Sequence, residues 1–149
     1  TLNYDKYNWD EHRDHFILAD CPDHDVDFGE GKKSIFALEG TEILIQRDKE
    51  VQMAAHEYGK GRGVYMAGFE YSPVNARMLL NLLLWAKGLP LNSDWLTTDP
   101  ETEAAWFPAD KTLVVINNST QKKSTVVKTP DGDIAVELDG LETKILPQN

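Results

Sequence analysis

The segment from His12 to Asp27 gathers side chains that could bind a metal ion. Its possible ligands are His12, His15, Asp20, Cys21, Asp23, His24, Asp25 and Asp27. Zinc sites usually pair their ligands at short spacings such as Cys-x-x-Cys, and this segment has a single cysteine. Asp23-x-Asp25-x-Asp27 begins with calcium-loop spacing, but the glycine falls one position late at Gly29 and Ser34 replaces the final Glu. We therefore predict a solvated acidic loop that binds no metal cofactor.

Cys21 is the one thiol of the chain and a conceivable nucleophile of a glutaminase-like site. A nucleophile elbow needs small glycines on both sides, because its turn is sharp and strained. Cys21 instead lies in Ala19-Asp20-Cys21-Pro22, and the neighbouring carboxylate would raise the pKa of the thiol. We predict an unreactive thiol, and a single cysteine allows no internal disulfide.

The glycine-rich run Gly59-Lys60-Gly61-Arg62-Gly63 could hold an oxyanion, because glycine loops expose N–H groups and Lys and Arg attract anions. Phosphate loops of this kind lie between a strand and the N-terminus of a helix. Here an apolar run lies on each side, which favours the turn of a β-hairpin.

Asn117-Asn118-Ser119-Thr120 contains two overlapping N-glycosylation sequons. The same residue types are common in polar turns, and we expect a turn without a glycan. From its residues, the chain is thus assigned no catalytic, cofactor-binding or metal-binding position.

Several strands and one helix are expected to position these residues. The predicted strands of the first part are His15–Ala19, Ser34–Leu38, Thr41–Gln46, and a hairpin of Val51–Glu57 with Arg62–Gly68. Ser72 is placed to cap a helix that has Pro73 at its first position and ends near Lys87, before Gly88. The pattern predicts an α/β arrangement.

The helix is unusually apolar for a surface element. At 100° per residue only Arg77 and Asn81 form a polar stripe, with Leu84 beside them. We expect the helix to be covered on several sides. If part of its leucine surface stays uncovered, self-association is the expected result.

The chain is expected to divide into two domains. Residues 1–90 form the α/β part, residues 91–103 lose periodicity and form a linker, and residues 104–149 form a small antiparallel β-sandwich-like domain. The strands expected in the last part are Ala104–Phe107, Thr112–Asn117, Ser124–Lys128, Asp133–Leu138 and Thr143–Leu146.

Charge and hydropathy exclude several classes of partner. The chain has 25 acidic against 15 basic residues and a formal charge of −10, which repels nucleic acid and anionic membrane surfaces. No run approaches the roughly 18 apolar residues of a membrane span. The chain begins without Met or a leader sequence, so we expect it to be a piece of a longer protein.

Four motifs together resemble the last third of the phosphorylases that act on galactosyl-β-1,3-N-acetylhexosamines, a family that includes lacto-N-biose phosphorylase and a relative acting on galactosyl-rhamnose. They are FGEG at Phe28–Gly31, the YGKGRGVYMAG hairpin, the NAR-containing helix after Ser72-Pro73, and the INNST turn. The resemblance covers nearly the whole chain. YGKGR hairpins also occur in amidotransferase-like accessory domains of β-galactosidases.

The resemblance implies that residues 1–90 are the end of a glutamine-amidotransferase-like α/β domain and that an upstream (β/α) barrel of the same polypeptide carries catalysis. There a carboxylic acid would protonate the leaving oxygen while inorganic phosphate attacks the anomeric carbon of the galactosyl disaccharide, with inversion. It also implies a cytoplasmic protein, a homo-oligomer, and no cofactor.

An alternative is a carbohydrate-binding or protein-interaction accessory module of a different carbohydrate-active enzyme. Trp85, Trp95 and Trp106 could offer stacking faces to sugars. Trp85 lies in the leucine-rich helix and is expected in the core. Trp95 and Trp106 flank the linker and are expected to join the two domains.

Overall fold

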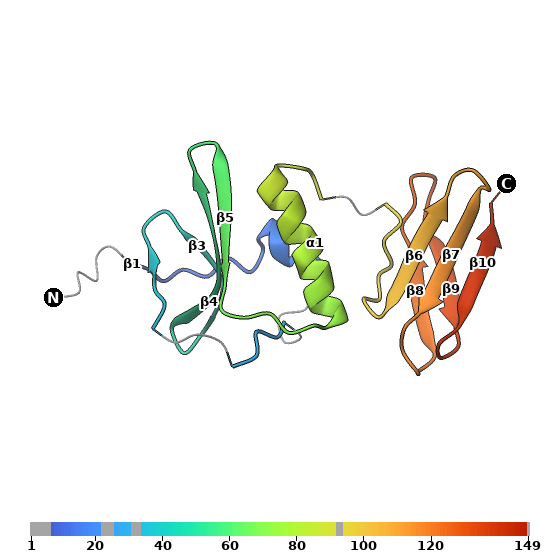
Figure 1. Ribbon diagram of the computed structural model, residues 1–149, viewed down its shortest axis with the longest axis horizontal. Coiled ribbons are helices and arrows are strands. Elements are labelled where there is room, and N and C mark those ends of the chain that lie inside the picture. The colour runs from blue at the N-terminus through green and yellow to red at the C-terminus, as the bar shows by residue number, and fades with distance from the viewer. Residues whose placement is uncertain (1–6, 22–25, 31–33, 92–93, 149) are drawn as a thin grey trace. The chain divides into compact units, whose positions relative to one another are not determined.

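The computed structural model describes residues 7–21, 26–30, 34–91 and 94–148. The chain separates into two compact units, Thr1–Leu91 and Asn92–Asn149. In the described parts, the first unit contains short strands and one α-helix, whereas the second contains only strands (Figure 1). Over the described residues, the fold is thus mostly antiparallel β-sheet with one α-helix.

The main sheet of the first unit has three antiparallel strands in the order β3-β4-β5. Their bounds are β3 Glu42–Arg47, β4 Glu50–Tyr58 and β5 Gly61–Met66. The central strand β4 buries five consecutive residues, Val51 to Ala55, so both of its faces are covered. Strand β3 and the β4–β5 hairpin confirm the predicted strands, and the turn between β4 and β5 uses Gly59 in the left-handed region, with φ 60°.

Two predicted strands are wrong or shortened. Residues Phe16–Leu18 form a 3₁₀-helix, η2, in place of the strand expected over His15–Ala19. The reason is local: His15 Nδ1 accepts a hydrogen bond from the N–H of Ile17, and the N–H of Leu18 donates to the carbonyl of His15. The strand expected over Ser34–Leu38 is shorter than predicted. It is reduced to β2, Ala37–Leu38, which pairs with β1, Tyr7–Asn8.

The helix α1, Pro73–Lys87, has the predicted ends. The hydroxyl of Ser72 accepts a hydrogen bond from the N–H of Asn75, and Gly88 closes the helix with φ 73°. No helix in the described ranges is long and apolar enough to cross a membrane.

The buried face of α1 differs from the predicted one. It consists of Val74, Asn75, Met78, Asn81 and Trp85, whereas Leu80 and Leu83 are 37% and 57% exposed. Asn81, expected on the polar stripe, is 1% exposed because its side-chain amide donates to the carbonyls of Ile17 and Ala19, at 3.3 and 2.8 Å. The carbonyls of Ile17 and Ala19 need a hydrogen-bond donor, and Asn81 of α1 supplies it. The helix therefore buries this asparagine in place of one more leucine.

The second unit is a two-sheet antiparallel structure. One sheet has the order β10-β7-β6 and the other pairs β8 with β9. Their bounds are β6 Thr102–Phe107, β7 Thr112–Asn117, β8 Lys123–Val127, β9 Ile134–Leu138 and β10 Thr143–Pro147. Buried residues of both sheets form one core, namely Leu113, Val115, Val127, Val136 and Leu138. All five predicted strands are confirmed, with small changes at their ends.

The segment before β6 is tied to the second unit. Thr97 forms an antiparallel bridge with Val127, and the N–H of Trp95 donates to the carbonyl of Lys128 at 2.6 Å. The hydroxyl of Thr102 donates to the carbonyl of Asp99 at 2.8 Å. Residues 95–98, which the sequence suggested as part of a linker, therefore lie along β8 with paired backbone groups.

Candidate functional site

The acidic stretch does not form a recognisable metal centre in the part of the chain that the structure describes. Asp23, His24 and Asp25 lie outside the described residues. Among the rest, no group of three or more His, Cys, Asp or Glu side chains could hold a metal ion. His15 is used within the fold, since its ring lies edge-on to Trp85 at a centroid distance of 5.4 Å.

Burial lowers the pKa of His15, and the nearby carboxylate of Glu42 opposes this shift. The ring atom Nε2 lies 3.9 Å from Oε2 of Glu42, and Nδ1 accepts the hydrogen bond that begins η2. Because Nδ1 accepts, the neutral ring is the form that fits this structure.

Cys21 lies in the core of the first unit. It is 6% exposed, and its Sγ atom is 4.0 Å from the carbonyl of Val74. Burial raises the pKa of the thiol to about 11, with the charge of Asp20 adding to the shift and that of Arg77 opposing it. The thiol is therefore protonated at neutral pH, and a buried, protonated thiol is a poor nucleophile.

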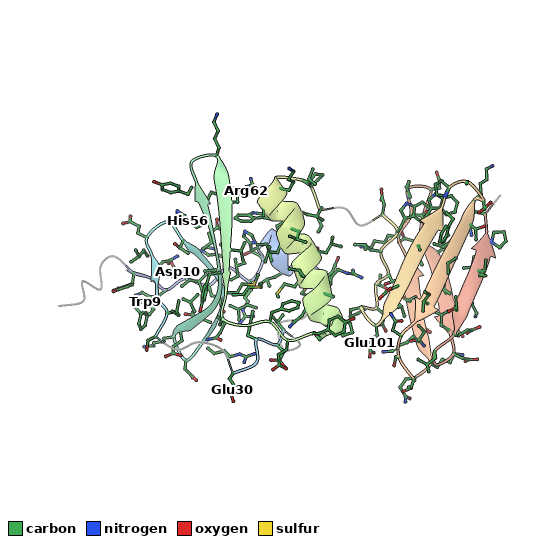
Figure 2. The ribbon with its side chains drawn as sticks, in the orientation of Figure 1. Trp9, Asp10, Glu30, His56, Arg62 and Glu101 are labelled. Carbon is green, nitrogen blue, oxygen red and sulfur yellow. The ribbon has the colours of Figure 1, made fainter. Side chains whose placement is uncertain are left out.

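The glycine-rich run connects two strands. Arg62 bonds Oε1 of Glu57 through Nε at 2.7 Å and donates from Nη1 to the carbonyl of Trp85, also at 2.7 Å. Its guanidinium also lies 5.1 Å from the centroid of the Trp85 ring. Figure 2 labels Arg62 between the β4–β5 hairpin and α1. The guanidinium of Arg62 thus stabilises the C-terminal end of α1, where the helix dipole is negative. The glycine-rich run leads into strand β5, whereas a phosphate loop would be followed by the N-terminus of a helix.

Asn117, the first sequon residue, is 1% exposed and organises two turns. Its side-chain amide donates to the carbonyls of Gln121 and Asp139, both at 2.8 Å. Its Oδ1 accepts from the N–H of Ser119 at 2.9 Å. A glycan would need the same amide nitrogen, so the structure supports the expected turn at this position.

The structure separates the three tryptophans considered for sugar stacking. Trp85 is buried in the first unit. Trp95 and Trp106, in contrast, stack on each other within the second unit, with ring centroids 4.6 Å apart and planes 1° apart. The sequence placed both beside a linker, and only the pairing of residues 95–98 with β8 brings them together.

This stack borders a cavity of about 490 Å³, which we call the tryptophan pocket. It is lined by Trp95, Trp106, Lys111, Thr129, Asp131, Gly132, Asp133, Ile134 and Gln148. The volume falls within the range of small-molecule sites, and a large aromatic surface with a few polar groups is typical of them.

Regular elements hold the pocket residues in place. Trp106 lies on β6 opposite Leu113, and Lys111 precedes β7, where its carbonyl accepts from the N–H of Gln148 at 2.8 Å. The turn that carries Asp131 is closed by the hydroxyl of Thr129, which donates to the carbonyl of Gly132 at 2.6 Å. A Cβ on Gly132 would meet no atom within 4 Å, so the turn is not crowded at this residue.

Comparison with known proteins shows similarity along almost the whole chain. Residues 1–90 match the family model of the lacto-N-biose phosphorylase central domain, and residues 95–146 match that of the lacto-N-biose phosphorylase C-terminal domain. These matches agree with the resemblance carried by the hairpin, helix and turn motifs.

Individual relatives cover most of the chain but are much longer. A 1,3-beta-galactosyl-N-acetylhexosamine phosphorylase of Lachnoclostridium phytofermentans is 46% identical over 132 residues, which are 88% of this chain and 18% of that protein. The enzyme of the same name from Bifidobacterium longum subsp. longum is 34% identical over an alignment of 166 positions, which covers 89% of this chain and 22% of that protein.

A third relative is named for a different substrate. The D-galactosyl-beta-1->4-L-rhamnose phosphorylase of Lachnoclostridium phytofermentans is 32% identical over 137 residues, covering 89% of this chain and 19% of that protein. The chain spans about a fifth of the length of these relatives. Because the family models together match residues 1–90 and 95–146, the chain belongs to the lacto-N-biose phosphorylase family.

Proposed function

We propose that the chain is the non-catalytic C-terminal region of a glycoside phosphorylase. The parent enzyme would cleave a galactosyl-β-1,3-N-acetylhexosamine, or galactosyl-rhamnose, with inorganic phosphate to give galactose 1-phosphate. The observation that carries this proposal is the pair of matches to the central and C-terminal domains of lacto-N-biose phosphorylase. The reacting groups would lie in an upstream (β/α) barrel of the same polypeptide.

The described side chains support a structural part in that enzyme. Cys21 is buried with a raised pKa, His15 begins η2, and Arg62 bonds the end of α1. A general acid or a phosphate-binding residue needs to be accessible to substrate, and these three groups are engaged with their own fold.

The proposed organisation follows the two units. The first would be the end of an amidotransferase-like α/β accessory domain up to residue 90, and the second the small β domain. Leu80 and Leu83 are exposed on α1, which supports a neighbouring surface on this side, from the parent polypeptide or from a second copy in a homo-oligomer. A lone buried thiol suits a reducing compartment and supports a cytoplasmic location.

Phosphorolysis by the chain and by its parent would test the proposal. The purified 149-residue chain and the longer polypeptide that contains it are incubated with phosphate and either lacto-N-biose or galactosyl-rhamnose, and galactose 1-phosphate is measured. We expect product from the longer polypeptide only. Product from the chain alone would contradict the non-catalytic assignment, and a longer polypeptide inactive on both sugars would contradict the phosphorylase assignment.

A further inference from the structure

We infer that the tryptophan pocket of the second unit binds a saccharide through one pyranose ring. The inference goes beyond the function proposed above and does not depend on it. The inference rests on the stacked indoles, on the unengaged polar groups around them, and on the backbone conformation that holds them.

The indole stack supplies an apolar platform of the right kind. Trp95 and Trp106 are parallel within 1° and both line the cavity. Each ring uses part of its surface against the other and against the core, and each remains half-buried. A flat indole surface at the wall of a cavity is complementary to the C–H-rich face of a pyranose, which is apolar although the ring edge carries hydroxyls.

Polar groups line the same cavity as this platform. Asp131 and Asp133 are exposed, and within the described residues neither carboxylate has a hydrogen bond or ion pair. The ammonium group of Lys111 is likewise unengaged in the part of the chain that the structure describes. Carboxylates accept hydrogen bonds from hydroxyls and an ammonium donates to them, so both kinds of partner are available for a neutral polyol.

Two residues of the pocket lining have a strained backbone conformation. Trp95 and Lys111 both have positive φ angles, of 64° and 46°. A left-handed conformation costs a non-glycine residue about 1 to 3 kcal/mol, and it is a clear outlier for a bulky side chain. The hydrogen bond from Trp95 to Lys128 holds this conformation and directs the indole onto Trp106.

A cationic ligand fits these observations less well. Sites for quaternary ammonium groups surround the cation with the faces of several aromatic rings. Here the two rings are parallel and stacked on each other, so their faces do not surround a cation. The geometry therefore favours a neutral ring over a cation.

The four tryptophan indole N–H signals of the isotope-labelled 149-residue chain provide a direct test. The chain is titrated with D-galactose, N-acetyl-D-glucosamine, L-rhamnose, lacto-N-biose and, separately, choline, and two-dimensional ¹H–¹⁵N spectra are recorded. We expect at least one saccharide to shift the Trp95 and Trp106 signals, with a dissociation constant on the order of 1 mM. The signals of Trp9 and Trp85 are internal references and should not move.

Variants of the two exposed carboxylates of the pocket, which we call the polar rim, complete the test without disturbing the core. Asp131→Ala and Asp133→Ala should each weaken saccharide binding about fivefold, as expected for one lost hydrogen bond. Asp139→Ala, in the same unit but outside the pocket lining, should leave it unchanged. The inference is overturned if no saccharide shifts the two signals, if choline alone does, or if the affinity survives both rim variants. None of these readouts involves phosphorolysis, so the proposed function is tested separately.

Discussion

The two units fill their interiors in different ways. In the second unit, β7 alternates half-buried and buried residues, and the buried ones meet residues of β8 and β9 in one core. In the first unit, the buried face of α1 includes Asn75 and Asn81, while Leu80 and Leu83 face solvent. Both asparagines donate to backbone carbonyls of segments outside the sheets.

The difference shows what decides burial. Strands in a sheet bond each other's backbone groups, so their side chains are free to sort by hydropathy. Irregular segments leave carbonyls and N–H groups without partners, and these must be satisfied when they are buried. An asparagine on a neighbouring helix can do this, and its hydrogen bonds outweigh the burial of one more leucine.

The largest effect should come from replacing the most enclosed asparagine. Asn75 is fully buried, its Nδ2 donates to the carbonyls of Asp27 and Glu70 at 2.5 and 2.6 Å, and its Oδ1 accepts from the N–H of Asp27. Asn75→Leu leaves these groups unpaired and should lower the free energy of unfolding by about 3 kcal/mol. Urea denaturation measures this change. Leu83→Asn, on the exposed side of α1, should change it by less than about 0.5 kcal/mol; equal losses would show that the two faces are not different.

A smaller loss is expected from the polar contacts inside the second unit. The hydroxyl of Thr125 is buried, accepts from the N–H of Asp99 at 3.2 Å and forms a hydrogen bond with the hydroxyl of Thr102 at 3.1 Å. Thr125→Val keeps the shape but removes both bonds, and should cost about 1 to 2 kcal/mol of unfolding free energy. Ser124→Val, exposed on the same strand, is the matched control. Thermal unfolding of both variants would refute the expectation if Thr125→Val were as stable as the control.

The contact between the hairpin and α1 should contribute less again. Arg62→Met removes the bonds to Glu57 and to the carbonyl of Trp85, and we expect a loss of about 1 kcal/mol because the side chain is partly exposed. Lys60→Met, at the exposed tip of the same turn, should have no measurable effect on unfolding in urea. A loss of the same size in both variants would point to net charge as the cause.

The smallest expected effect is a change of stability with pH, and it concerns histidine in the first unit. All four histidines lie in the first unit. Burial lowers the pKa of His15, so its contribution to stability is present above the unfolded value near 6.5 and is lost as the pH falls below it. The unfolding free energies at pH 7.5 and 5.5 should differ less in His15→Asn than in the unsubstituted chain. The asparagine can still accept the hydrogen bond from Ile17, but it does not titrate. An unchanged difference would mean that His15 does not contribute.

Local signals in the sequence predicted the elements whose ends are set locally. Ser72, Pro73 and Gly88 define α1, Gly59 marks the hairpin turn, and alternation identifies the strands of the second unit. The buried face of α1 was not predicted, because it depends on hydrogen bonds between residues 62 and 64 positions apart. The hydrogen bonds of η2 are local, but its run of apolar residues has the pattern of a strand.

The tryptophan pocket shows the same limit. The sequence singled out Trp95 and Trp106 but assigned them to a joint between domains. Their stacking depends on where residues 95–98 pair along β8, which no local pattern indicates. The resemblance to phosphorylases, in contrast, was predicted from short sequence motifs, which do not depend on contacts between distant residues.

Strand β5 forms one edge of the β3-β4-β5 sheet, and its first half is exposed. An uncovered edge strand can recruit strands of other molecules and begin aggregation. The exposed half has the sequence Gly61-Arg62-Gly63, next to Lys60. Two glycines lower the tendency to extend a sheet, and the charge of Lys60 disfavours pairing with an identical edge. We therefore expect the glycine-rich run that suggested a phosphate loop to oppose association of this edge with other molecules.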